Sequence, residues 1–205
     1  MAFEGTAIDL YRVKPAIVQG LDPVLRRLER SGVTPDALTL AAIPVGAAGG
    51  LAVLASPAVP GALLLVPVVA AARLVLNLLD GSLARRTGRM HPRGELFNEV
   101  GDRVADVLML APVALVPGAI GPAVWLGAVL ALLASFVSVT TRAAGGTRSY
   151  RGILSKPGRM VLLSAFAIAV VVIGPAAWAP FSILLALGTL ATFVERVVGA
   201  MRELP

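Results

Sequence analysis

Long apolar segments separated by short turns constrain the fold of this chain more than any other feature. Six segments of helical length lie at about residues 36–55, 61–86, 94–116, 123–141, 159–174 and 179–198. Each is close to the ~20 residues that an α-helix needs to cross the hydrocarbon core of a bilayer. Because 57% of the residues are hydrophobic and only 15% are charged, a soluble domain is excluded. The sequence therefore predicts an all-α integral membrane protein with six transmembrane helices.

The N-terminal segment, residues 1–33, has a different pattern. Charged residues interrupt it early, so it lacks the apolar run of a signal peptide. Its apolar residues on one helical face are Ile17, Leu21, Val24, Leu25 and Leu28. This predicts an amphipathic helix that lies along the membrane interface or docks onto the protein's own bundle, and both remain open. The predicted domains are this juxtamembrane segment and a six-helix transmembrane domain, residues 34–205, which begins at the Thr34-Pro35 helix start.

Charge predicts the topology. The turns at about 56–60, 117–122 and 174–180 carry no charge, whereas the N-terminal segment, the turns at 85–93 and 142–159 and the C-terminal tail carry nearly all Lys and Arg. The positive-inside rule then places both termini in the cytoplasm of an inner-membrane protein. The net charge of +6 follows the ends of the apolar segments, and no nucleic-acid motif is present, so nucleic acid is not an expected partner.

Two polar stripes lie inside the second and third apolar segments. Helical spacing puts Arg73, Asn77, Asp80 and Ala84 on one stripe, and Glu95, Glu99, Asp102 and Asp106 on another, with Asn98 at its edge. The connection between the segments is short, so the helices are expected to be antiparallel neighbours. A rise of about 1.5 Å per residue puts Arg73 level with Asp106, Asn77 level with Asp102, and Asp80 level with Asn98 and Glu99. The stripes are therefore predicted to face each other.

Carboxylates inside a membrane span are costly and usually mark a functional site. Carboxylates that converge repel one another unless a cation joins them, and all-oxygen ligands suit Mg²⁺, Mn²⁺ or Ca²⁺. Alternatively, Arg73 neutralises Asp106 or Asp102 within a packing interface, which leaves Asp80, Glu95 and Glu99 unexplained. The chain has no Cys and one His, so thiol chemistry and His-based metal sites are excluded.

The stripes contain a motif of known spacing. It reads Asn77-Leu-Leu-Asp80-Gly81-Ser-Leu-Ala84-Arg85, eight residues, Gly94, three residues, Asn98, three residues, Asp102. This resembles the signature of the CDP-alcohol phosphotransferase family: Asp, two residues, Asp-Gly, two residues, Ala-Arg, a spacer, Gly, three residues, Asp, three residues, Asp. The segment from Val33 to Thr39 resembles the family's entry to its first membrane helix. Asn77 and Asn98 replace the first and third aspartates, so the chain resembles a divergent member.

The resemblance implies a phosphatidyltransferase of phospholipid biosynthesis that moves a phosphatidyl group from CDP-diacylglycerol to a hydroxyl acceptor and releases CMP. It also implies a homodimer and a divalent cofactor, Mg²⁺ or Mn²⁺, with two ions in the family. The metal ligands are expected at Asn77, Asp80, Asn98 and Asp102, with Asp102 as the base. We add Asp106 as an extra ligand or alternative base. Gly81, Ala84, Arg85 and Arg73 are expected to bind the nucleotide or phosphate of the donor. Arg73 is expected to supply positive charge at a one-metal or weakened two-metal site.

Basic residues of the polar loop 142–159 complete the predicted site. Arg142, Lys156 and Arg159 are expected to bind an anionic polyol acceptor such as glycerol 3-phosphate or inositol phosphate. Alternatively, these charges set topology and bind anionic lipid. Two further functions stay open: a family member that binds CDP-lipid without turnover, and a small ion or solute transporter. The outer halves of the spans hold almost no polar residues, which disfavours the transporter.

Overall fold

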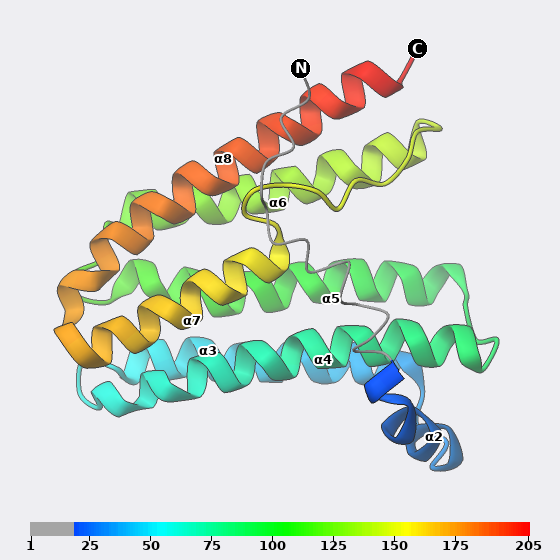
Figure 1. Ribbon diagram of the computed structural model, residues 1–205, viewed down its shortest axis with the longest axis horizontal. Helices are drawn as coiled ribbons and strands as arrows, with labels where there is room; N and C mark the ends of the chain where they lie inside the picture. The colour runs from blue at the N-terminus through cyan, green and yellow to red at the C-terminus, as the bar shows by residue number, and fades with distance from the viewer. Residues whose placement is uncertain (1–18) are drawn as a thin grey trace.

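The structure, a computed structural model, describes residues 19–205 and is helical with short connections (Figure 1). Its α-helices are α2 (Asp22–Arg30), α3 (Pro35–Ala55), α4 (Leu65–Arg86), α5 (Pro92–Leu110), α6 (Gly121–Ala143), α7 (Lys156–Ile173) and α8 (Trp178–Glu203). Three short 3₁₀ helices are η1 (Pro60–Leu64), η2 (Ala111–Leu115) and η3 (Pro175–Ala177). The boundaries follow the predicted segments closely, with Pro or Gly at most of the turns.

Helix α3 packs directly against α5 through small residues. Thr34 caps its N-terminus, since the Thr34 hydroxyl accepts a hydrogen bond of 3.2 Å from the amide of Ala37. On the face toward α5, a Cβ at Gly46 would lie 2.8 Å from the carbonyl oxygen of Ala105, and one at Gly50 only 2.0 Å from that of Leu108. Glycine is therefore required where the two backbones touch, as in many membrane helix pairs.

The apolar core joins α4 and α7 to the ends of α5, α6 and α8. Its largest buried side chains include Trp178, Phe181, Leu63, Met109 and Leu163. Trp178 and Phe181 pack edge to face, with ring centroids 5.4 Å apart. Helices α6 and α8 form a pair beside the layer of α3, α4, α5 and α7 (Figure 1). This core lies at the end of the bundle remote from the α4–α5 turn.

Helix α2 is docked onto the bundle. Leu25 is buried against Leu38, Leu79 and Leu83. Arg86 holds the helix from α4, with ion pairs of 2.6 Å to Asp22 and 2.9 Å to Glu29. Docking was one of the two predicted alternatives, and the interfacial location stays a prediction. Ile17, which the sequence placed on the same face, lies outside the described residues.

Five of the six predicted spans are long and apolar enough to cross a membrane. These are α3, η1 with α4 (Pro60–Arg86), α6, α7, and η3 with α8 (Pro175–Glu203). The third predicted span differs: α5 is a helix of the bundle, but Glu95, Glu99, Asp102, Arg103 and Asp106 lower its hydropathy too far. Large apolar side chains on the outer faces of the other helices are exposed, as a lipid-facing surface requires. The fold is therefore that of a membrane protein with five such helices and one polar helix packed among them.

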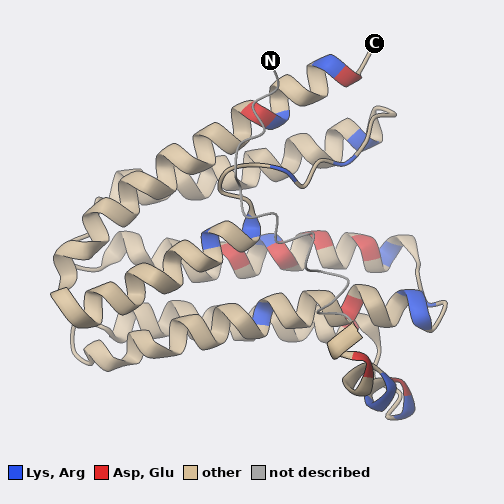
Figure 2. Ribbon diagram, in the orientation of Figure 1, with Lys and Arg blue, Asp and Glu red and all other residues tan. Residues whose placement is uncertain are grey.

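Charged residues gather at one end of the bundle (Figure 2). This end contains the α4–α5 turn and the segment between α6 and α7, whereas the opposite end, with η1, η2 and η3, carries no charge. The two ends of the bundle therefore differ in charge as the sequence predicted. Which end faces the cytoplasm stays a prediction.

Candidate functional site

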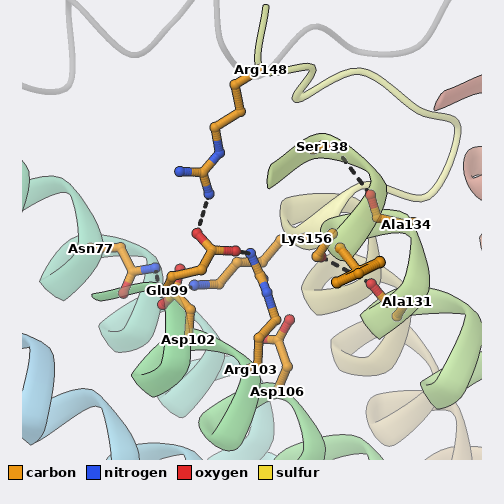
Figure 3. Close-up of polar contacts among 12 residues, drawn as sticks. Asn77, Glu99, Asp102, Arg103, Asp106, Ala131, Ala134, Ser138, Arg148 and Lys156 are labelled. Atoms are coloured by element: carbon orange, nitrogen blue, oxygen red, sulfur yellow. Dashed lines mark hydrogen bonds and ion pairs between the residues drawn. The ribbon is translucent and has the colours of Figure 1, made fainter. Parts of the chain in front are cut away.

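The two predicted stripes meet along α4 and α5. Nη2 of Arg73 lies 2.9 Å from Oδ1 of Asp106. Nδ2 of Asn77 donates to Oδ1 of Asp102 at 2.8 Å (Figure 3). Both pairs were predicted to lie at matching heights, and both contacts confirm it. A constant rise along two antiparallel helices explains the matching heights. The helices were also predicted to be direct neighbours, and this part was wrong: α3 packs against both of them, and α4 and α5 meet mainly through these long side chains.

Asp80, which was predicted to lie level with Asn98 and Glu99, bonds to Thr39 of α3 and to the adjacent backbone. Its Oδ2 accepts a hydrogen bond of 3.0 Å from the Thr39 hydroxyl on α3, and its Oδ1 accepts one of 2.5 Å from the amide of Gly81. Among the described residues it bonds to neither Asn98 nor Glu99. The reason is the close approach of α3, which brings Thr39 against Gly101 of α5 and within reach of Asp80. Sequence spacing along α4 and α5 contained no signal for this third helix.

The acidic row of α5 also pairs with basic residues from the end of α6 through the start of α7. In chain order the ion pairs are Glu95–Arg142, Glu99–Arg148, Asp102–Lys156 at 2.6 Å and Asp106–Arg159 at 2.8 Å. The three residues predicted to bind an acceptor are thus each held by a carboxylate. Figure 3 shows Arg148 reaching down from the connecting segment to Glu99, which also pairs with Arg103.

Burial increases steadily along this row of ion pairs. The carboxylate side chain is 55% exposed at Glu95, 20% at Glu99, 16% at Asp102 and 5% at Asp106. Arg73, which also bonds to Asp106, is fully buried. The row therefore runs from the charged end of the molecule into its interior. Asp102 lies at a depth where its carboxylate is still partly exposed to solvent.

The inner part of the site is balanced in charge. Its carboxylates are Asp80, Asp102 and Asp106, and its cations are Arg73, Lys156 and Arg159. Three negative and three positive charges sum to zero. From the sequence, these carboxylates were predicted to need an external cation. The structure shows that α7 places two cations, Lys156 and Arg159, beside them. The usable signal was the spacing of Lys156 and Arg159, which puts both on one face of a helix start.

Gly81, Ala84 and Arg85 form the more open part of the site at the end of α4. A Cβ at Gly81 would lie 3.5 Å from Nη1 of Arg85, so the guanidinium lies over the glycine. Its Nη2 donates to the Ser82 hydroxyl at 3.3 Å. Arg85 is exposed, and no carboxylate in residues 19–205 forms an ion pair with it. It is therefore a cation available to an anionic ligand.

Asp80 and Asp102 are the two carboxylates of the inner site that could share a divalent ion. Asp80 and Asp102 repel each other electrostatically, so a shared cation would stabilise both. Asn77 turns an N–H toward Asp102, and both oxygens of Asp106 accept from arginines. Within the described part of the chain, no three Asp, Glu or His side chains are grouped closely enough to hold an ion. Asp106, predicted as an extra ligand or base, is instead buried between two guanidiniums.

Comparison with known proteins gives one clear sequence relative. No protein-family model matches the chain. The inner membrane protein YnbA of Escherichia coli (strain K12) is 31% identical over 163 residues, which are 80% of this chain and 81% of YnbA.

Solved structures with the same fold come from phosphatidylinositol phosphate synthase (PgsA1) of Mycobacterium tuberculosis. The structure with CDP-DAG bound has a TM-score of 0.74 and 23% identity, covering 88% of this chain and 93% of that one. The complex with manganese and citrate has the same TM-score and identity, covering 88% of each chain. At this identity the similarity demonstrates the fold. Since the match to YnbA is stronger in sequence and covers most of both proteins, the chain belongs to the family of the inner membrane protein YnbA.

Proposed function

We propose that this protein is a membrane phosphatidyltransferase of the CDP-alcohol phosphotransferase type, acting in phospholipid biosynthesis. It would move a phosphatidyl group from CDP-diacylglycerol to a hydroxyl acceptor and release CMP. The observation that carries the proposal is the hydrogen bond from Asn77 to Asp102, which joins the two halves of the motif in one polar site. The fold shared with PgsA1, a protein solved with CDP-DAG bound, supports this assignment.

Asp102 is the proposed general base. It is partly accessible, and its Oδ2 accepts no hydrogen bond from residues 19–205, whereas Oδ1 is held by Asn77 and Lys156. Asp102 would take the proton of the acceptor hydroxyl. The acceptor oxygen then bonds to the lipid-side phosphorus, the bond from that phosphorus to the bridging oxygen breaks, and CMP leaves with the electron pair.

The donor would bind at the open end of α4. Arg85 would pair with a donor phosphate, and the small residues Gly81 and Ala84 would let the nucleotide approach the helix. One divalent ion, Mg²⁺ or Mn²⁺, is proposed between Asp80 and Asp102, with Asn98 as a neutral ligand. When bound, such an ion supplies charge neutralisation of the pyrophosphate. The manganese complex of PgsA1 supports a divalent ion of this kind.

The acceptor is proposed to be an anionic polyol that approaches the basic residues Arg142, Lys156 and Arg159 from the charged end of the bundle. Arg142 is the most exposed of them, and its ion pair with Glu95 is open to solvent, so an acceptor phosphate can compete for it. Lys156 lies deeper and would act on the reacting end of the acceptor, whereas Arg159 is buried against Asp106 and would hold that carboxylate in place. A homodimer in the inner membrane, with both termini and the site on the cytoplasmic side, completes the proposal. The inner-membrane description of YnbA supports the location.

A second candidate function is CDP-lipid binding without turnover. The ion pairs of Asp102 with Lys156 and of Asp106 with two arginines favour it, because these carboxylates are already neutralised. In this case the site would hold the donor, and Asp102 would remain bound to Lys156 as a structural group.

Release of CMP from CDP-diacylglycerol by the purified protein, tested with Mg²⁺ and a panel of alcohols, separates these functions. We expect release that needs one acceptor and is lost in Asp80→Ala. Glu203→Ala, which removes a carboxylate bonded to Thr147 at the far end of α8, is the matched control and should retain activity. Binding of CDP-diacylglycerol with no CMP release from any alcohol would favour the second function. Neither binding nor release would reject both.

A further inference from the structure

Lys156 is placed where a cation would be expected beside the carboxylates. It is the first residue of α7, and its side chain is 15% exposed. Its Nζ lies 2.6 Å from Oδ1 of Asp102, the same oxygen that accepts from Nδ2 of Asn77 at 2.8 Å. One carboxylate oxygen is thus occupied by an ammonium and an amide, both of which belong to the chain itself.

The charge count of the inner site leads to the same point. With Arg73, Lys156 and Arg159 against three carboxylates, the site is neutral without any metal ion. One divalent ion would give an excess of two positive charges, which a pyrophosphate diester, with one negative charge on each phosphate, would balance. A second divalent ion would leave an excess of two positive charges within this inner set of residues.

The ammonium also opposes a second ion directly. A divalent ion near Oδ1 of Asp102 would lie within a few ångströms of Nζ, where repulsion in a partly buried site is strong. Asn77 turns a donor toward that oxygen, so it offers no ligand at the same point. Asp106, the next carboxylate, is held on both oxygens by Arg73 and Arg159.

We infer that the Lys156 ammonium replaces a divalent cation beside Asp102, so that this site takes at most one divalent ion, next to Asp80. The inference rests on the proposed function for the identity of the pyrophosphate donor. The number of ions, however, is a property of the protein without donor and can be measured independently of turnover.

Mn²⁺ binding to the detergent-purified full chain, followed by the electron paramagnetic resonance signal of free Mn²⁺, tests the inference. Wild type should bind no more than one ion per chain. Lys156→Met should gain a second ion or bind Mn²⁺ roughly tenfold more tightly, because it removes a fixed charge at the site. Lys156→Arg keeps the charge and should behave as wild type. Arg103→Gln, which removes a cation paired with Glu99, is the control for charge alone and should leave the ion count unchanged.

The double variant Lys156→Met with Asp102→Asn should lose the gain, since the added ion would bind to Asp102. Two tightly bound ions on wild type, or a Lys156→Met variant with unchanged binding, would overturn the inference. Elution as a single species in size exclusion checks the fold of each variant, and Lys156→Gln replaces Lys156→Met if the latter fails. If no variant folds, the wild-type ion count decides alone. If wild type releases CMP and binds two ions, the inference about Lys156 is refuted and the proposed function is not. If wild type binds one ion and releases no CMP, the proposed turnover is refuted and the inference about Lys156 is not.

Discussion

The guanidinium of Arg73 and the carboxylate of Asp106 form a fully buried ion pair, with Nη2 2.9 Å from Oδ1. Nη2 of Arg159 lies 2.8 Å from Oδ2, the other oxygen of Asp106. One negative charge is thus shared between two buried guanidiniums. A carboxylate held in this way is a structural element rather than a free ligand, because removing it would strand both guanidiniums away from water.

Loss of Asp106 should therefore destabilise the protein severely. Asp106→Ala leaves two buried cations without their partner, and we expect a loss of about 3–5 kcal/mol in unfolding free energy. Thermal unfolding in detergent measures this. Glu95→Ala, on the same row but exposed, should change stability by less than about 1 kcal/mol. An Asp106→Ala protein as stable as wild type would contradict the buried-pair arrangement.

The hydrogen bond from Thr39 to Asp80 should matter for activity. Thr39→Val keeps the shape but removes the hydroxyl that lies 3.0 Å from Oδ2 of Asp80. Since hydrogen bonds to charged groups are worth about 1.5–3 kcal/mol, we expect kcat/KM for CDP-diacylglycerol to fall roughly tenfold or more. Thr39→Ser should restore most of it. Equal activity of the valine and serine variants would show that this contact does not position Asp80.

The backbone contact between α3 and α5 should tolerate no side chain at Gly50. A Cβ there would lie 2.0 Å from the carbonyl oxygen of Leu108, so Gly50→Ala should force the helices apart and cost about 1–3 kcal/mol. Gly199→Ala in α8 is the matched control, because nothing lies within 4 Å of its Cβ position. The control should be neutral or slightly stabilising. Thermal unfolding of both variants measures the difference in stability. Equal unfolding temperatures for the two variants would count against the close contact between α3 and α5.

Neighbouring arginines at the end of α4 should have separate roles. Arg85→Gln should raise the KM for CDP-diacylglycerol roughly tenfold without lowering stability, because Ser82 is the one side chain in residues 19–205 to which Arg85 bonds. Arg86→Gln should instead loosen α2, since Arg86 pairs with Asp22 and Glu29, and should leave the KM nearly unchanged. Steady-state kinetics and limited proteolysis of the N-terminal segment distinguish them. Identical effects of the two substitutions would contradict this division.

The proposed topology can be measured directly because the chain has no Cys. Single cysteines at Val59→Cys and Arg89→Cys mark the charge-free and the charged end of the bundle. A membrane-impermeant maleimide applied to intact cells should label the first and leave the second unlabelled until the membrane is opened. The reverse pattern would invert the assignment of the cytoplasmic face.

Hydropathy and helical rise predicted a large part of this architecture. The apolar segments gave the helix boundaries, and the heights of Arg73 and Asn77 along α4 predicted their partners on α5. Both results depend on short-range regularity, since a rise and a short turn fix the register of two antiparallel helices. The same reasoning predicted that α5 spans the membrane, but its charged residues make it too polar to count among the candidate spans.

The remaining contacts depend on which other helices pack around the pair. Thr39 precedes Asp80 by 41 residues, and Lys156 follows Asp102 by 54. Periodicity shows that each lies near a helix end, but it contains no information on the neighbour that the helix faces. The sequence therefore identified the carboxylates correctly as an unusual group. It assigned their neutralisation to an external ion, whereas Lys156 and Arg159 of α7 provide a large part of it.

The glycine contact of α3 with α5 has a consequence for how the two sides of α5 are held. Because the two backbones touch at Gly46 and Gly50, a shift of α3 against α5 would have to break backbone-to-backbone contacts. The opposite flank of α5 is attached through side-chain ion pairs such as Glu95–Arg142, which break and re-form without unfolding a helix. Sequence changes should therefore be tolerated more easily on the side of α5 that faces the connection between α6 and α7 than at the glycine contact with α3.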